Sequence, residues 1–410
     1  MGINKASYNK EDGILFILLA SLAAGSLSGL MQLPRTFSIL FFFLLITKYR
    51  PTKILGKALK FLSFWFSWAA FSLIWTSDFS NGTRELILLL TNFLLFFEIV
   101  YFAGRSTNLT KILALGWCAA FMITAAIGVW EILTDNHLAL SKHGDDAYMI
   151  ADGQYLAHHY ASATFVNFNS YVVFICYCVP FLLYGYFQST KLLGKILTIS
   201  LLLVSVFILF MNASRGGILA LALQVALFFL PLMSGKGAKG TILGLLIILI
   251  AGFCIFWDEI SLYIMIRSAG TSSFEDEPRY DIWMRALKCF WPTLGFGTGV
   301  GSVMASMRTV SSSGDVIIPH NAVLEILVQY GVVICLVCVR FVWRIFKARK
   351  YTRDKYMKAL ITSSISSLVA ILIIDSSYLL SPGFWAFFAS LYCIVNSDAF
   401  VRPSYSYNHG

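Results

Sequence analysis

The chain has 410 residues, of which 58% are hydrophobic and 16% aromatic, while only 13% are charged. Soluble domains have about a quarter of their residues charged, and the mean hydropathy here is +0.75. These values exclude a soluble globular protein and predict an all-α polytopic membrane protein, with residues 1–410 forming a single integral membrane domain. The formal net charge of +10 has to be interpreted in that setting.

Apolar segments long enough, or nearly long enough, to cross a hydrocarbon layer about 30 Å thick recur along the whole chain. In chain order they cover residues 13–31, 34–47, 58–76, 86–103, 112–133, 164–187, 192–211, 215–233, 241–257, 320–343, 359–375 and 383–400. We therefore expect about 12 transmembrane helices. The first segment lacks a small-residue cleavage site after it, so we expect it to be retained as a span.

The basic residues are shared unevenly between the two sides of the predicted membrane. Assigning the loops alternately to two sides places most of the 31 lysine and arginine residues on one of them. That side should be cytoplasmic, with both termini on it, because basic residues are enriched in cytoplasmic loops. The longest loops, residues 134–163 and 258–319, then face outward. Topology and anionic lipid thus explain the charge, and we expect no nucleic-acid partner.

The sequence does not predict a metal site, a disulfide framework or a cofactor. Every cysteine except Cys289 lies within an apolar segment. In the first long outer loop, the histidines His137, His143, His158 and His159 lie beside acidic residues, but they do not have the spacing of a helical ligand pair.

Arg215 lies in the segment MNASRGGILA, at a tight outer turn between two spans. Gly216 and Gly217 follow it and open the next helix. An arginine at a helix N-terminus opposes the helix dipole, and a bound anion would relieve that conflict. Its fork of donors and the helix-start amides suit phosphate oxygens. The alternative is an interfacial arginine whose side chain extends to the lipid headgroups.

The second outer loop contains the segment EPRYDIWMRALKCFWPTLGFGTGVG, Glu277–Gly301. Its apolar residues have helical spacing from Arg279 onward, with Arg285 and Lys288 off the apolar face, so we expect an amphipathic interfacial helix that Pro292 ends. Four glycines follow at alternate positions. This pattern differs from a dinucleotide-binding fingerprint and predicts a flexible or closely packed turn.

The segment IIPHNAVLEILVQYGVVI places His320 and Asn321 directly after a proline, in the expected first turn of a long apolar helix. Asn321, Glu325 and Gln329 recur every four residues and form a polar stripe that should face protein or water. His320 could act as a general base or donate a hydrogen bond to an oxyanion. The alternative is a structural histidine at the membrane interface.

Two further polar features lie inside predicted spans. Asn167 and Asn169 begin the sixth span on different faces of its helix, as substrate contacts or as helix-packing hydrogen bonds. Glu98 lies deep in the fourth span. Because no other charge shares its depth, we interpret it as a buried, hydrogen-bonded carboxyl group and not as a proton-coupling site.

Together these features resemble the O-antigen ligase and O-antigen polymerase superfamily, bacterial membrane glycosyltransferases of the GT-C type. The similarity rests on four segments in the same order: TFVNFN (Thr164–Asn169), SRGG (Ser214–Gly217), RYDIW with its glycine turn (Arg279–Gly299), and HNAVLEILVQYG (His320–Gly331). Ile334 departs from the pattern, since a ligase-type motif would have Gly, Thr or Tyr there.

The resemblance implies a metal-independent, inverting transfer of a glycan from undecaprenyl diphosphate on the periplasmic face of the inner membrane. Arg215 and Arg279 would hold the diphosphate, and His320 would activate the acceptor hydroxyl or assist the leaving group. The other expected substrate contacts are polar side chains of the same motifs, Asn321, Arg285, Asn167, Asn169 and Glu325. The partners would be the lipid-linked donor, a glycan acceptor, membrane lipid and a chain-length regulator protein.

The acceptor distinguishes the alternatives. The Asn-x-Asn pair and Ile334 favour a polymerase, which transfers to another lipid-linked glycan. Against a polymerase, neither outer loop has an arginine followed by ten residues and a glycine. A ligase would transfer to the lipid A core instead. A lipid-linked oligosaccharide flippase would need charges deep in several spans or matching broken helices, and the sequence shows one deep acid.

Overall fold

The computed structural model describes residues 8–48, 53–140, 148–150, 154–156, 160–212, 214–233, 279–310, 318–352, 354–374 and 378–396. The predicted ninth span, residues 241–257, lies outside these ranges, as do parts of both long predicted outer loops.

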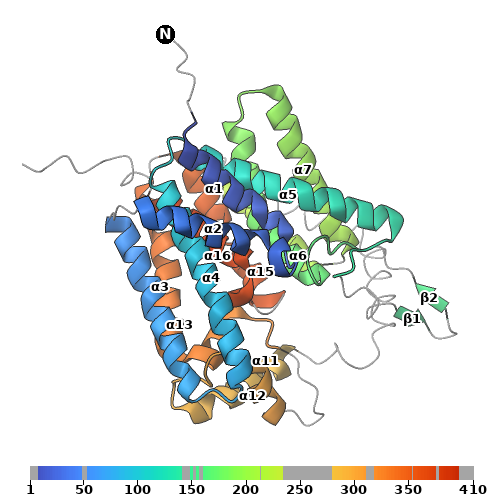
Figure 1. Cartoon of the computed structure of the whole chain (residues 1–410). Helices are drawn as coiled ribbons and strands as arrows, with labels where there is room; N and C mark the ends of the chain where they lie inside the picture. Colours follow the sequence, from blue (N-terminus) through green and yellow to red (C-terminus); the bar gives the residue numbers. More distant parts are fainter. Residues whose placement is uncertain are drawn as a thin grey trace, which may run out of the picture.

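The described chain is mainly helical (Figure 1). Its helices are α1 (Lys10–Ala20), α2 (Leu33–Lys48), α3 (Lys53–Phe71), α4 (Phe79–Ala103), α5 (Leu109–Thr134), α6 (Phe168–Gln188), α7 (Leu192–Met211), α8 (Arg215–Phe229), α11 (Arg279–Phe290), α12 (Val303–Val310), α13 (Ala322–Ala348), α14 (Lys355–Ser363), α15 (Ser367–Ile373) and α16 (Pro382–Val395). Strands β1 (Tyr148–Ile150) and β2 (Gln154–Leu156) form an antiparallel hairpin within the first long loop, with Met149 opposite Tyr155.

Five of the described helices, α4, α5, α6, α7 and α13, are long and apolar enough to cross a membrane. Helices α2, α8 and α16 are apolar but shorter. The protein is thus a multi-pass membrane protein, as predicted, whereas the number of 12 spans is not confirmed. The first predicted span is divided, since α1 ends at Ala20 and 3-10 turns follow it. The predicted span 359–375 is likewise divided into α14 and α15.

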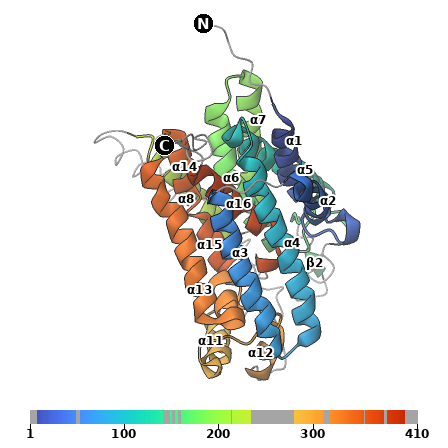
Figure 2. The same cartoon turned by 60° about the vertical axis from the view of Figure 1, so that its left-hand side comes forward.

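Loops that were predicted to share a side of the membrane meet in the structure. Asn9 Nδ2 donates to Arg105 O (2.8 Å), which joins two predicted inner segments. Thr76 Oγ1 donates to Val300 O (2.8 Å), which joins two predicted outer segments. Figure 2 shows α3, α4 and α13 running along one another, with α11 and α12 together at one end. We call this the α11–α12 end.

Helix α6 is largely buried in the core. It is joined to α8 and α15 through a backbone carbonyl that has no hydrogen-bond donor within α6. Pro180 lies inside α6 and has no N–H, so the carbonyl of Cys176 loses its helical donor. Gln224 Nε2 and Ser367 Oγ donate to it instead, at 2.6 and 2.9 Å. An unsatisfied backbone group is costly in an apolar interior, so these bonds join α6, α8 and α15.

Helix α13 is bent at Gly331, where φ is 78° and ψ is −174°. The carbonyls of residues 328–330, just before the bend, accept hydrogen bonds from outside the helix. Their donors, in order, are the N–H of Thr298 (2.7 Å), the N–H of Gly299 (3.0 Å) and the indole N–H of Trp68 (2.8 Å). The bend therefore attaches α13 to α3 and to the glycine-rich turn that follows α11.

The sequence predicted either a flexible or a closely packed turn after α11, and the turn at residues 295–301 is closely packed. Its four glycines all have positive φ, between 74° and 94°. A Cβ atom at Gly297 would lie 2.5 Å from the backbone nitrogen of Gly331, so only glycine permits this approach. The turn thus holds the bend of α13 by direct backbone contact.

Candidate functional site

His320 lies immediately before α13 and not in its first turn, where the sequence placed it. Its φ is +48°, a left-handed conformation that is uncommon for residues with a side chain. Asn321 then caps the helix, because its Oδ1 accepts the N–H groups of Val323 (3.0 Å) and Leu324 (3.1 Å). A half-buried histidine in a sparsely populated conformation beside a helix cap is a good candidate for a functional residue.

Helix α11 is fixed against the beginning of α13. Trp283 Nε1 donates to the carbonyl of Pro319 (2.9 Å), the residue directly before His320. Ile282 and Ala286 are buried together with Val328 of α13 in a small apolar cluster. The amphipathic helix predicted from the sequence is therefore present, and its apolar face packs on the helix that His320 precedes.

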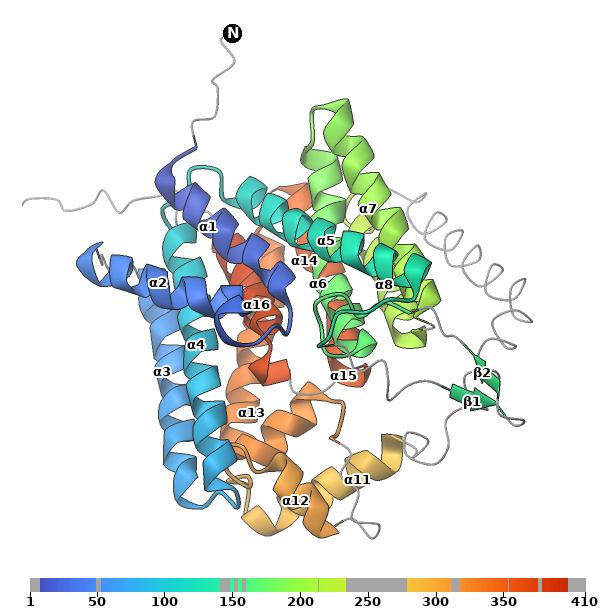
Figure 3. The same ribbon diagram turned by 45° about the vertical axis from the view of Figure 1, so that its right-hand side comes forward.

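This packing brings two of the predicted site segments together. Arg285 lies half-buried on α11, and Arg279 is the first residue of that helix. The side chains of Arg279 and of Arg215, the first residue of α8, lie outside what the structure describes. Figure 3 shows α11 and α12 below α8 and α15. The positions of the two backbones are thus described, while the roles of the two guanidinium groups stay predictions.

The predicted polar stripe on α13 faces protein. Glu325 and Gln329 are each only 4% exposed. Gln329 Nε2 donates to Glu85 Oε2 on α4 (2.7 Å), and Asn81 Nδ2 donates to the other oxygen of Glu85 (3.2 Å). Sequence reasoning missed Glu85, because its partner on α13 is 244 residues away and no local pattern marks it.

The remaining predicted residues begin α6 and α8. Ser214 Oγ accepts the N–H of Gly217 (3.2 Å), so Arg215 opens α8 as predicted. Asn167 Oδ1 accepts the N–H of Ser170 (2.8 Å) and caps α6, while Asn169 lies half-buried in its first turn. Asn167 therefore has a structural role, and its contact with substrate remains a prediction.

The residues that the structure describes contain no group of three or more His, Cys, Asp and Glu side chains placed to hold a metal ion. His137 is the one histidine of the first long outer loop among them. The described cysteines are all free, including Cys335 and Cys338 on α13.

An apolar cavity of about 440 Å³ runs along α13. It begins at Ala322 and Val323, directly after Asn321, and extends to Phe346, with α3, α4, α15 and α16 supplying the other walls. Val339 and Trp343 line it although they are 52% and 66% exposed, so within the described part of the chain it opens at the surface of the bundle. The cavity thus joins an open apolar face to the polar residues before α13.

Residues 199–339 match a protein-family model described as O-antigen ligase (Wzy_C). The matched part includes the starts of α8 and α11, the glycine turn and the beginning of α13, but not Asn167. No curated protein matches the chain. The resemblance of the chain to the O-antigen ligase and polymerase superfamily is therefore confirmed, through the match of residues 199–339.

Proposed function

We propose that the protein is a membrane glycosyltransferase that moves a glycan from undecaprenyl diphosphate to the sugar hydroxyl of another lipid-linked glycan, as an O-antigen polymerase. The apolar cavity beside α13 is the observation that carries the proposal. A polyprenyl chain needs an apolar path that it can enter from the bilayer, and Val339 and Trp343 lie where the cavity opens. Its diphosphate would then lie at the polar end, near His320.

The proposed transfer requires charge-stabilising and proton-transferring groups at the polar end of the cavity. As the diphosphate leaves, negative charge develops on its oxygens, and arginine side chains and helix-start amides stabilise such charge. Arg215 and Arg279, each the first residue of a helix, are proposed for this role. His320 would accept the proton of the acceptor hydroxyl or donate one to the leaving group. Asn321, Arg285 and Glu325 would shape the acceptor side.

The proposed location is the bacterial inner membrane, with both termini cytoplasmic and the α11–α12 end in the periplasm. The distribution of lysine and arginine supports this orientation, because basic loops remain cytoplasmic. A chain-length regulator protein is the proposed protein partner. Its contact surface is not assigned.

The alternative acceptor is the lipid A core, which would make the protein an O-antigen ligase, and the description of the matching family favours it. The structure removes one argument for a polymerase, since Asn167 is explained by its helix cap. Ile334 still supports a polymerase. It is fully buried where a ligase-type motif would have Gly, Thr or Tyr.

Deleting the gene and examining surface polysaccharide on a gel distinguishes a polymerase from a ligase. Core carrying a single repeat unit identifies a lost polymerase, whereas naked core with accumulated lipid-linked polymer identifies a lost ligase. His320→Ala should reproduce the deletion while the protein still inserts into the membrane. Full transfer by this variant would exclude the role assigned to His320.

The cavity has a test of its own. Cys338→Trp fills the cavity, and we expect it to prevent use of the lipid-linked donor. Leu336→Trp is the matched control, because Leu336 is 61% exposed on the same helix and does not line the cavity. Equal transfer by the two variants would remove the cavity from the proposal. Purified protein that transfers no glycan between supplied donor and acceptor would favour the flippase.

A further inference from the structure

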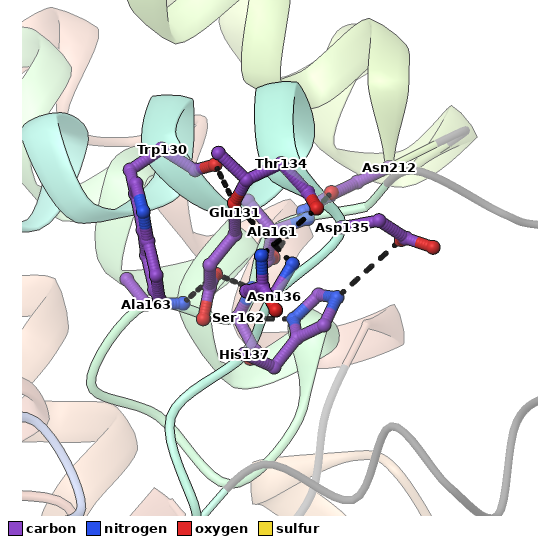
Figure 4. Close-up of polar contacts among 10 residues, drawn as sticks. All are labelled: Trp130, Glu131, Thr134, Asp135, Asn136, His137, Ala161, Ser162, Ala163 and Asn212. Carbon is purple, nitrogen blue, oxygen red and sulfur yellow. Dashed lines mark hydrogen bonds and ion pairs between the residues drawn. The ribbon is translucent and has the colours of Figure 1, made fainter.

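The last turns of α5 carry a fully buried carboxyl group that the proposed reaction does not use. Glu131 Oε2 accepts two backbone hydrogen bonds, from the N–H of Ser162 (2.8 Å) and from the N–H of Ala163 (2.6 Å) (Figure 4). Ala163 has a φ of +48°, a conformation that residues with a Cβ rarely adopt. Glu131 therefore holds an unfavourable bend in the segment that leads into α6.

Asn212, at the end of α7, holds the same segment from another side. Its Oδ1 accepts the N–H of Ala161 (2.7 Å) and its Nδ2 donates to the carbonyl of Ala161 (2.9 Å). Glu131 and Asn212 thus bind three consecutive residues, 161–163. Asn212 also caps the end of α7, and the N-cap of α8, Ser214, donates its N–H to Leu209 O of α7 (3.2 Å), so the contacts of Asn212 lie close in the chain to the start of α8.

His137 contacts the other oxygen of the Glu131 carboxyl group. Its Nδ1 lies 3.6 Å from Glu131 Oε1, and its Nε2 lies 3.9 Å from Asp135 Oδ1. The imidazole is only 5% exposed and packs against the ring of Tyr160, with 5.1 Å between ring centroids. The carboxyl group of Glu131 is therefore contacted through both oxygens, which leaves it few ways to move.

We propose that Glu131 is a positioning residue that acts through residues 161–163 and Asn212 to fix the position of the first residues of α8. A long arginine side chain meets a diphosphate in a defined geometry only when its backbone is fixed. The inference rests on the proposed function, in which Arg215 binds the donor. It reaches beyond the family match, because Glu131 lies outside residues 199–339.

Binding of undecaprenyl diphosphate to the purified full-length protein tests the proposal. Glu131→Leu removes both acceptor contacts, and we expect it to weaken binding about tenfold, the scale of one misplaced charge-assisted contact. Glu131→Gln keeps an oxygen that can accept both N–H groups and should bind within about threefold of wild type. Glu98→Gln, which changes a buried carboxyl group on α4, is the control and should bind like wild type.

The same substitution made in an Arg215→Gln background gives the decisive measurement. If Glu131 acts through Arg215, Glu131→Leu should change binding there by less than about twofold, because coupled residues are not additive. A tenfold loss in both backgrounds would show a general structural effect and would overturn the proposal, as would unchanged binding by Glu131→Leu. If that variant does not fold, Asn212→Ala takes its place in the cycle. Wild-type protein that does not bind the lipid would instead refute the proposed function.

Discussion

The bend of α13 offers a sharp test, because one methyl group should disrupt it. We predict that Gly331→Ala destabilises the protein strongly. With φ at 78° and ψ at −174°, Gly331 occupies a backbone region that only glycine populates readily. The packing around it is also closed, since an added Cβ would overlap the carbonyl oxygen of Gly295 and lie 2.5 Å from the carbonyl carbon of Phe296.

The magnitude follows from these two contributions. Holding alanine in this conformation costs about 1–3 kcal/mol. Overpacking costs about another 1–3 kcal/mol, and here the opposing atoms belong to the backbone and cannot rotate away. The predicted loss of folding free energy is therefore about 2–6 kcal/mol, a large share of the roughly 5–15 kcal/mol that a folded protein has.

Thermal unfolding of the purified protein in detergent measures the effect. Gly56→Ala is the matched control, because Gly56 lies in α3 with no atom within 4 Å of an added Cβ, so alanine should be neutral or slightly stabilising there. A Gly331→Ala protein that melts at the same temperature as Gly56→Ala would refute the reasoning about the bend.

Three further predictions concern hydrogen bonds between helices and loops. Trp283→Phe removes the bond to Pro319 and should lower the free energy of unfolding by about 1 kcal/mol. Glycan transfer should fall by more than the loss of folded protein explains, because α11 is no longer fixed beside His320. Unchanged transfer in the gel assay would contradict this. Glu85→Leu removes the closest acceptor of the Gln329 amide and should lower the unfolding free energy by about 1–3 kcal/mol, with Glu85→Gln losing less in the same melting assay. Gln224→Leu leaves one of the two donors to the open α6 carbonyl, so its effect should be smaller than that of the double variant with Ser367→Ala; equal melting temperatures would count against this account.

Local sequence chemistry predicted some helix starts but not the breaks. Arg215 and the two following glycines predicted the start of α8 correctly, since helix opening is a local event, and the structure adds Ser214 as its cap. The predicted span 359–375 is divided instead, because Ser363 Oγ donates to Gln224 O (2.8 Å) and Ser367 bonds to α6. Hydropathy cannot detect such a break, which depends on partners far away in the sequence.

The same limit applies to the site. His320, Asn321 and the amphipathic helix were recognisable because their types and spacing are local. Glu131 carries no such local pattern, since its partners at residues 162 and 163 come about thirty residues later and are backbone groups with no sequence signature. Buried acids whose partners are backbone groups therefore leave no pattern in the sequence.

The spacing of the His-Asn motif and its glycine has a structural explanation. Residues 322–330 form a short helical segment that is fixed at both ends, by the Asn321 cap at its start and by Gly331 at its end. The cap sets where His320 leaves the helix. The glycine turns the last carbonyls of the segment toward the turn at residues 295–301, which is anchored to α4 and to the segment that joins α3 to α4. If His320 takes part in transfer as proposed, a change at Gly331 should disturb that transfer, although the glycine itself would not touch the substrate.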